Sequence, residues 1–460
     1  MLFPTTTFAI FFMIVLPLSW ALQPRRRAWM AFILLASYVF YGWWNWKFVF
    51  LLIASTVVNH FLAVAIHRST AVAARKAFLT LAVAFDIGLL AYFKYSGFFV
   101  SSFDNLVGTS WIVDVTLPIG VSFFTFMAIS YVVDTYRREI EPASFARFAV
   151  FQAFFPHLVA GPIVRASELM PQLETPRNPR RVDNPRAFFL IVSGLFLKVV
   201  IANHLATHIV DDVFAAPDRH SSLEVLIAIY GYAVQIFADF CGYTNIAIGI
   251  ALLLGFEFPQ NFNSPYSAVS LRDFWRRWHM TLSRWLRDYL YIPLGGSRKG
   301  TFMTYRNLMI TMLLGGLWHG AAWTFVIWGG IHGLGLSIER AVGWTPTSRR
   351  GIWIGRIVTF HVVCLAWVFF RSDSLARAEQ VLHRLFDAWG QPSPLVTTSV
   401  LLAIAVGIGV QYVRPGMLGQ IELRFGRLST AVQAICLAVC LMVIDTLGPQ
   451  GVAPFIYFRF

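Results

Sequence analysis

Charged residues are scarce in this sequence. Asp, Glu, Lys and Arg make up 13% of its 460 residues, whereas a soluble globular domain averages about 25%. Hydrophobic residues make up 57%, and apolar stretches of membrane-spanning length recur without a soluble domain between them. This pattern predicts an all-α polytopic membrane protein. Because the apolar runs are continuous and do not alternate with period two, a transmembrane β-barrel is excluded.

Several common catalytic and binding motifs are also missing. The sequence has no G-x-S-x-G, no Gly-rich phosphate loop and no H-E-x-x-H, which disfavours a serine hydrolase, a nucleotide-driven pump and a zinc protease. It has four cysteines, all in apolar segments and without disulfide or metal-ligand spacing. We therefore expect no bound metal and no bound cofactor.

The positive charge follows the topology of a membrane protein. The net charge is +14, but the basic residues gather in short gaps between the apolar stretches, for example at 25–27, 137–138 and 272–299. This is the positive-inside pattern, which also attracts anionic lipid headgroups. It argues against nucleic acid as a partner.

The apolar segments predict about 11–12 transmembrane helices, with re-entrant or interfacial helices, around a central cavity. The N-terminus is expected outside, and residues 1–460 are expected to form one integral-membrane domain. The predicted spans lie near 6–22, 28–46, 48–66, 77–95, 115–133, 186–212, 223–254, 303–317, 320–340, 352–370, 396–413 and 429–447.

Two segments break this pattern. Residues 145–165 have basic residues at both ends, which predicts a re-entrant hairpin turning near Pro156. Residues 307–338 carry no Asp, Glu, Lys or Arg; as one helix they would be about 48 Å long, against a hydrocarbon core of about 30 Å. A broken helix is required there, and Gly315, Gly316 and Gly320 are the expected break. His319 lies beside that break, where an imidazole needs a partner or a water-filled site.

The loop 261–300 mixes Arg and Trp and contains His279. One interpretation is an amphipathic helix at the cytoplasmic face, with Trp in the headgroup region and Arg on lipid phosphates. The alternative is a binding site in which Arg276 and Arg277 hold the phosphates of a substrate. Both interpretations stay open from the sequence.

Other polar residues lie within predicted spans. Asp239 is an intramembrane carboxylate that either pairs with a cation or orients a histidine. His332 and His361 are interpreted as hydrogen-bonded core histidines, and the role of His157 stays open. A neutral imidazole in a wet cavity suits deprotonation of a hydroxyl, while a transporter or flippase with a histidine-lined path also fits broken helices and intramembrane charges.

Eight motifs, in this order, resemble the membrane-bound O-acyltransferase family, specifically the bacterial branch that acetylates alginate and related exopolysaccharides. They are LPIGVSFFTF (117–126), SYVVDTYR (130–137), FFPHLVAGPIVR (154–165), DFCGYTNIAIG (239–249), NFNSPY (261–266), DFWRRWHMTLSRWLRDYLYIPLGG (273–296), LWHGAAWTF (317–325) and the terminal PFIYFRF.

This resemblance implies a catalytic role for His319, as general base or transient acyl carrier, and makes His279 the second site residue, which orients or stabilises the acyl carbonyl. Trp318 and Trp278, which precede these histidines, and Asp239 are candidate supporting residues. The implied donor is acetyl-CoA or another activated acyl donor on the cytoplasmic side. The implied partners are an extracytoplasmic acetyltransferase and polysaccharide-export machinery, at the bacterial inner membrane. Acylation of another envelope polymer, such as D-alanylation of teichoic acid, is the alternative within the family.

Overall fold

The computed structural model describes residues 1–109, 111 and 115–448. These residues form helices and connecting loops, and no β-strand occurs among them. The terminal PFIYFRF motif lies outside the described residues. Contacts group the chain into two compact units, Met1–Ala187 with Ala247–Pro259, and Phe188–Ile246 with Gln260–Phe460. The single domain expected from the sequence stays a prediction.

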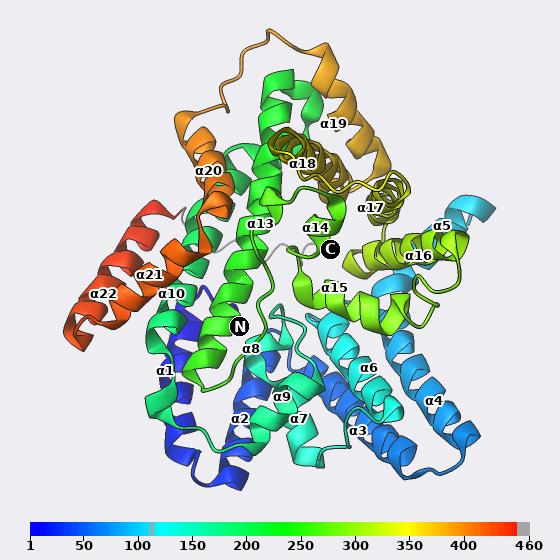
Figure 1. Cartoon of the computed structure of the whole chain (residues 1–460), viewed down its shortest axis with the longest axis vertical. Coiled ribbons are helices and arrows are strands. Elements are labelled where there is room, and N and C mark those ends of the chain that lie inside the picture. The colour runs from blue at the N-terminus through cyan, green and yellow to red at the C-terminus, as the bar shows by residue number, and fades with distance from the viewer. Residues whose placement is uncertain (110, 112–114, 449–460) are drawn as a thin grey trace. The chain divides into compact units, whose positions relative to one another are not determined.

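Most of the helices are labelled in Figure 1. Through residue 174 they are α1 (Thr6–Leu22), α2 (Arg26–Gly42), α3 (Lys47–Arg68), α4 (Val72–Leu90), α5 (Ser96–Val107), α6 (Val121–Arg137), α7 (Phe145–Ala153), α8 (Phe155–Leu158) and α9 (Ala166–Glu174). They continue with α10 (Asn184–Leu195), α11 (Asn203–Leu205), α12 (Asp211–Ala215), α13 (Ser222–Leu253), α14 (Leu271–Trp275), α15 (Met280–Leu286), α16 (Thr301–His319), α17 (Trp323–Ala341), α18 (Arg349–Arg371), α19 (Leu375–Asp387), α20 (Thr398–Gly409), α21 (Pro415–Gly426) and α22 (Thr430–Leu447).

The all-α, multi-pass architecture is confirmed, with fewer full-length spans than the eleven or twelve expected. Among the described residues, six helical stretches are long and apolar enough to cross a membrane, or seven if one bent pair counts as a span. Other predicted spans form shorter helices, such as α1, α2 and α6, each of 17 residues. Such a helix is about 25 Å long, less than a hydrocarbon core of about 30 Å.

The expected break in segment 145–165 is present in the first unit. Helix α7 ends at Ala153, Phe154 leaves the helical conformation, and the four-residue α8 follows with Pro156 in its first turn. A proline lacks the backbone N–H that would continue the preceding helix, which explains the interruption. These residues are buried. Re-entry into a membrane stays a prediction.

In the second unit, the charge-free segment forms the two helices that its length requires. Helix α16 ends at His319, and α17 begins at Trp323 and packs against it (Figure 1). The expectation that Gly315 and Gly316 also belong to the break is wrong, because α16 runs through both. A Cβ on Gly316 would lie 2.2 Å from the Phe325 carbonyl oxygen. This glycine therefore serves the close approach of the two helices.

Candidate active site

His319 is the last residue of α16 and is buried, with 2% of its surface exposed. Three aromatic rings surround it: Trp318 and Trp328 at 5.0 Å and Phe370 at 5.3 Å between ring centroids. Helices α16, α17 and α18 each contribute one of them. The helix end at Gly320 thus places the imidazole inside a ring-lined core, and the partner or water-filled site expected for it from the sequence stays a prediction.

His279 directly precedes α15 and is fully buried. Its φ of 41° is left-handed, a conformation that bulky residues seldom adopt. The Phe240 ring packs edge-on against it at 4.7 Å. His279 lies in the loop region between candidate spans, and burial lowers the pKa of its imidazole to about 3. The ring is therefore neutral at physiological pH.

The two histidines that the sequence singled out lie together. Their ring centroids are 6.4 Å apart, and Trp318 lies 6.0 Å from the His279 ring. Trp318 thus contacts both imidazoles. Trp278 instead is buried and packs against Phe262, with ring centroids 5.0 Å apart. Its burial supports the backbone that precedes His279.

A side-chain amide fixes the orientation of the His279 ring. Asn261 Oδ1 lies 3.1 Å from His279 Nδ1 and accepts hydrogen bonds from the backbone N–H and the hydroxyl of Thr281 at 3.2 and 2.9 Å. The Asn261 carbonyl also accepts the N–H of Met280 at 2.9 Å. The backbone carbonyl and the side chain of Asn261 therefore both stabilise the turn that carries His279. The sequence alone indicates no role for Asn261, although this residue opens the NFNSPY motif.

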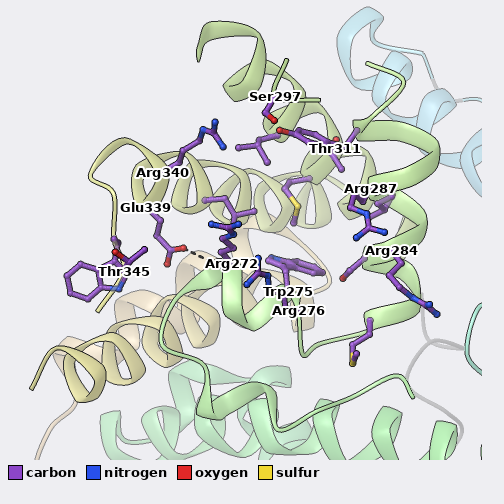
Figure 2. Close-up of a pocket in the computed structure, with 18 of the residues that line it drawn as sticks. Arg272, Trp275, Arg276, Arg284, Arg287, Ser297, Thr311, Glu339, Arg340 and Thr345 are labelled. Atoms are coloured by element: carbon purple, nitrogen blue, oxygen red, sulfur yellow. Dashed lines mark hydrogen bonds between the residues drawn. The ribbon is translucent and has the colours of Figure 1, made fainter. Parts of the chain in front are cut away.

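The second unit contains a cavity of about 660 Å³, whose lining includes neither His279 nor His319. Met280, the residue after His279, lines it, as does Met312 of α16. Figure 2 shows how arginines from α14, α15 and α17, and from the turns that follow α14 and α15, gather around it. The arginines that line the cavity are Arg272, Arg276, Arg284, Arg287 and Arg340.

The carboxylate that lines the same cavity is held by backbone amides. Glu339 accepts the N–H groups of Leu271 and Arg272 at 2.5 and 3.1 Å (Figure 2). Arg287 pairs with Asp288. The arginines that line the cavity outnumber Glu339 and Asp288, so the cavity favours an anionic ligand. Guanidinium groups bind phosphate through paired hydrogen bonds.

The structure separates the two arginines that the sequence had proposed together. Arg276 lines the cavity. Arg277 is absent from its lining, and its Nε donates to Asp273 Oδ1 at 2.8 Å, one helical turn earlier. Arg277 thus holds the 273–277 turn, while Arg276 is available to an anion.

Asp239 on α13 pairs with a cation. Its Oδ1 accepts a hydrogen bond from Nζ of Lys198, and both side chains are buried. Lys198 lies on the π-helical turn Phe196–Ala202. The pairing interpretation is therefore the one that the structure favours, and it is Asn261, not a carboxylate, that orients His279.

The three other histidines considered from the sequence, His332, His361 and His157, each lie within hydrogen-bond distance of a neighbouring group. Trp275 Nε1 donates to His332 Nδ1 at 3.3 Å, and His332 is fully buried. His361 lies 2.9 Å from the Tyr230 hydroxyl but is exposed on the surface of the described chain. Nε2 of His157 lies 2.8 Å from the Phe151 carbonyl oxygen.

Known proteins are similar to this chain over most of its length. The family model for membrane-bound O-acyltransferases matches residues 68–370. A probable alginate O-acetylase AlgI of Pseudomonas aeruginosa is 42% identical over 77% of this chain and 68% of that protein. A peptidoglycan O-acetyltransferase of Helicobacter pylori is 40% identical over 76% and 72%, respectively.

A second probable alginate O-acetylase AlgI, from Pseudomonas putida, is 38% identical over 93% of this chain and 94% of that protein. The similarity thus extends over nearly the full length of both sequences. The transporter interpretation loses its basis, because the family and these relatives are acyltransferases. The chain is a multi-pass membrane protein and an acyltransferase, and it belongs to the membrane-bound O-acyltransferase family.

Proposed function

We propose that this protein transfers acetyl groups to hydroxyls of an extracytoplasmic, alginate-like polysaccharide. The observation that carries the proposal is the buried pair His279 and His319, in the same unit as an arginine-lined cavity. The names of the relatives support acetyl transfer, and two of the three name alginate. Because one relative is a peptidoglycan O-acetyltransferase, a peptidoglycan hydroxyl is the alternative acceptor to compare with alginate.

The cavity is the proposed site of the acyl donor. An acetyl thioester such as acetyl-CoA carries phosphates that suit Arg272, Arg276 and Arg340. Its volume of about 660 Å³ lies within the range of small-molecule sites. Met280, the residue after His279, lines the cavity, and the proposal directs the acyl end of the donor towards the histidine pair.

His319 is the proposed general base or transient acyl carrier. As base, it takes the proton of the acceptor hydroxyl while that oxygen bonds to the acyl carbon. The bond between the acyl carbon and the thioester sulfur then breaks, and the thiolate leaves and takes up a proton. As carrier, a ring nitrogen of His319 first takes the acyl group and then passes it to the hydroxyl.

The proposed cellular setting is the bacterial inner membrane, with the N-terminus outside and the donor on the cytoplasmic side. An extracytoplasmic acetyltransferase and polysaccharide-export machinery are the proposed partners. The orientation has a direct test. A reporter fused near Arg349 is expected to be cytoplasmic, and one fused near Gly108 external; the same location for both would contradict it.

The function itself is tested with purified full-length protein in lipid nanodiscs, incubated with [¹⁴C]acetyl-CoA and either alginate or peptidoglycan fragments. We expect label on the protein or on alginate. Label on peptidoglycan alone would change the acceptor and keep the chemistry. Absence of label on protein and glycans, with and without an added extracytoplasmic acetyltransferase, would contradict acetyl transfer from this donor.

A further inference from the structure

The hydrogen bonds around Asn261 determine which nitrogen of His279 carries its proton. The backbone N–H of Thr281 is always a donor, so the atom of Asn261 that faces it must be the amide oxygen. That same oxygen lies 3.1 Å from Nδ1 of His279. An oxygen without a hydrogen only accepts, so Nδ1 must donate, and the proton of the neutral ring lies on Nδ1.

The second nitrogen of His279 then carries a lone pair. Nε2 is buried and has no hydrogen-bond partner among the described residues. Burial of a polar atom without a hydrogen-bond partner destabilises the folded protein unless a ligand or water supplies that partner. Because the His319 ring lies 6.4 Å from the His279 ring, the proposed function makes the acceptor the candidate partner of Nε2.

We propose that Asn261 is a positioning residue, which holds His279 as the Nδ1–H tautomer and presents its Nε2 as a hydrogen-bond acceptor for a hydroxyl of the acceptor. This proposal rests on the proposed function and changes one part of it. The family resemblance implied that His279 stabilises the acyl carbonyl. A neutral ring with a bare Nε2 cannot donate a hydrogen bond there, so the carbonyl must take its donors from other groups.

The strained turn at His279 explains why Asn261 is needed. A non-glycine residue in the left-handed region is less stable than in its usual conformations. Asn261 offsets this lower stability at two points, through its backbone carbonyl on Met280 and its side chain on His279 and Thr281. The backbone conformation and the tautomer are thus fixed by one residue.

Solid-state NMR of protein labelled with ¹⁵N-histidine tests the tautomer without reference to activity. The His279 signals are assigned by their loss in His279→Gln. In the wild type we expect a protonated Nδ1 and an unprotonated Nε2. Asn261→Ala should give a mixture of tautomers, and Asn261→Asp, which keeps the acceptor oxygen, should retain the single one. A protonated Nε2 in the neutral wild-type ring, or an unchanged tautomer in Asn261→Ala, would overturn the proposal.

Kinetics supply a second readout. Asn261→Ala should lower kcat for acetyl transfer about 10- to 100-fold, with little change in the donor KM, and Asn261→Asp should restore much of it. Thr281→Val is the matched control, since it removes one donor to the same oxygen and leaves the His279 contact in place. Equal loss in all three variants would assign Asn261 to folding alone. If neither the wild type nor any variant shows turnover, the NMR result still decides which tautomer His279 adopts.

Discussion

The rings of His279 and His319 lie 6.4 Å apart, centre to centre, and are inclined by 58°. Between them the chain forms α15, the π-helical segment Arg287–Tyr291 and α16, which ends at His319. His319 is placed by the end of a helix, and His279 by a left-handed turn. The site therefore depends on one regular and one strained element.

The first prediction separates two adjacent arginines. Arg276→Ala should raise the KM for acetyl-CoA about tenfold, and the effect should shrink at high salt, because Arg276 lines the cavity and a charged contact to phosphate is screened. Arg277→Ala should leave this KM unchanged, since its partner is Asp273. Donor binding measured at two ionic strengths decides. A larger effect for Arg277 would move the donor site away from this cavity.

The sequence predicted the α16–α17 pair because a charge-free run longer than one crossing must turn back. It could not assign Gly316 correctly, since a glycine at a break and a glycine at a close helix contact look the same without the partner helix. The spacing of Asp273 and Arg277, four residues apart, did indicate their ion pair.

Asn261 and Asp239 show what only the fold reveals. The contact of Asn261 with His279 depends on the left-handed turn, which no local pattern predicts for a histidine. Lys198 is 41 residues from Asp239, and the π-helical turn that carries it shifts the helical register. Such pairings depend on tertiary packing, while the catalytic role that the resemblance implies for the two histidines stays a prediction.

The second prediction concerns the glycine contact between α16 and α17. A Cβ on Gly329 would lie 2.3 Å from the Met312 carbonyl oxygen, so Gly329→Ala must push the helices apart. We expect a loss of about 1–3 kcal/mol of stability, seen as a lower thermal midpoint in detergent. The control is Gly330→Ala, whose Cβ would meet nothing nearer than Leu313 Cδ2 at 3.8 Å. Equal midpoints for the two variants would refute the close-contact account.

The third prediction concerns the buried pair Lys198 and Asp239. Asp239→Asn leaves an ammonium group buried without its carboxylate, which should lower the free energy of unfolding by about 3–5 kcal/mol. The double variant Lys198→Met/Asp239→Leu should recover most of that stability. If Asp239 also orients a catalytic group, the double variant will be stable yet inactive. Full activity in the double variant would make the pair purely structural.

The most direct measurement is acetyl transfer by His319→Gln beside His332→Gln, each compared at equal amounts of purified, folded protein. Glutamine keeps a polar side chain of similar volume, which matters because His319 is packed among Trp318, Trp328 and Phe370. Loss of a general base typically lowers the rate about 100- to 10,000-fold. We therefore predict near-normal yield with turnover abolished for His319→Gln, and turnover retained for His332→Gln. Substantial turnover in His319→Gln with loss in His332→Gln would contradict the site, and full turnover in both would contradict the histidine mechanism.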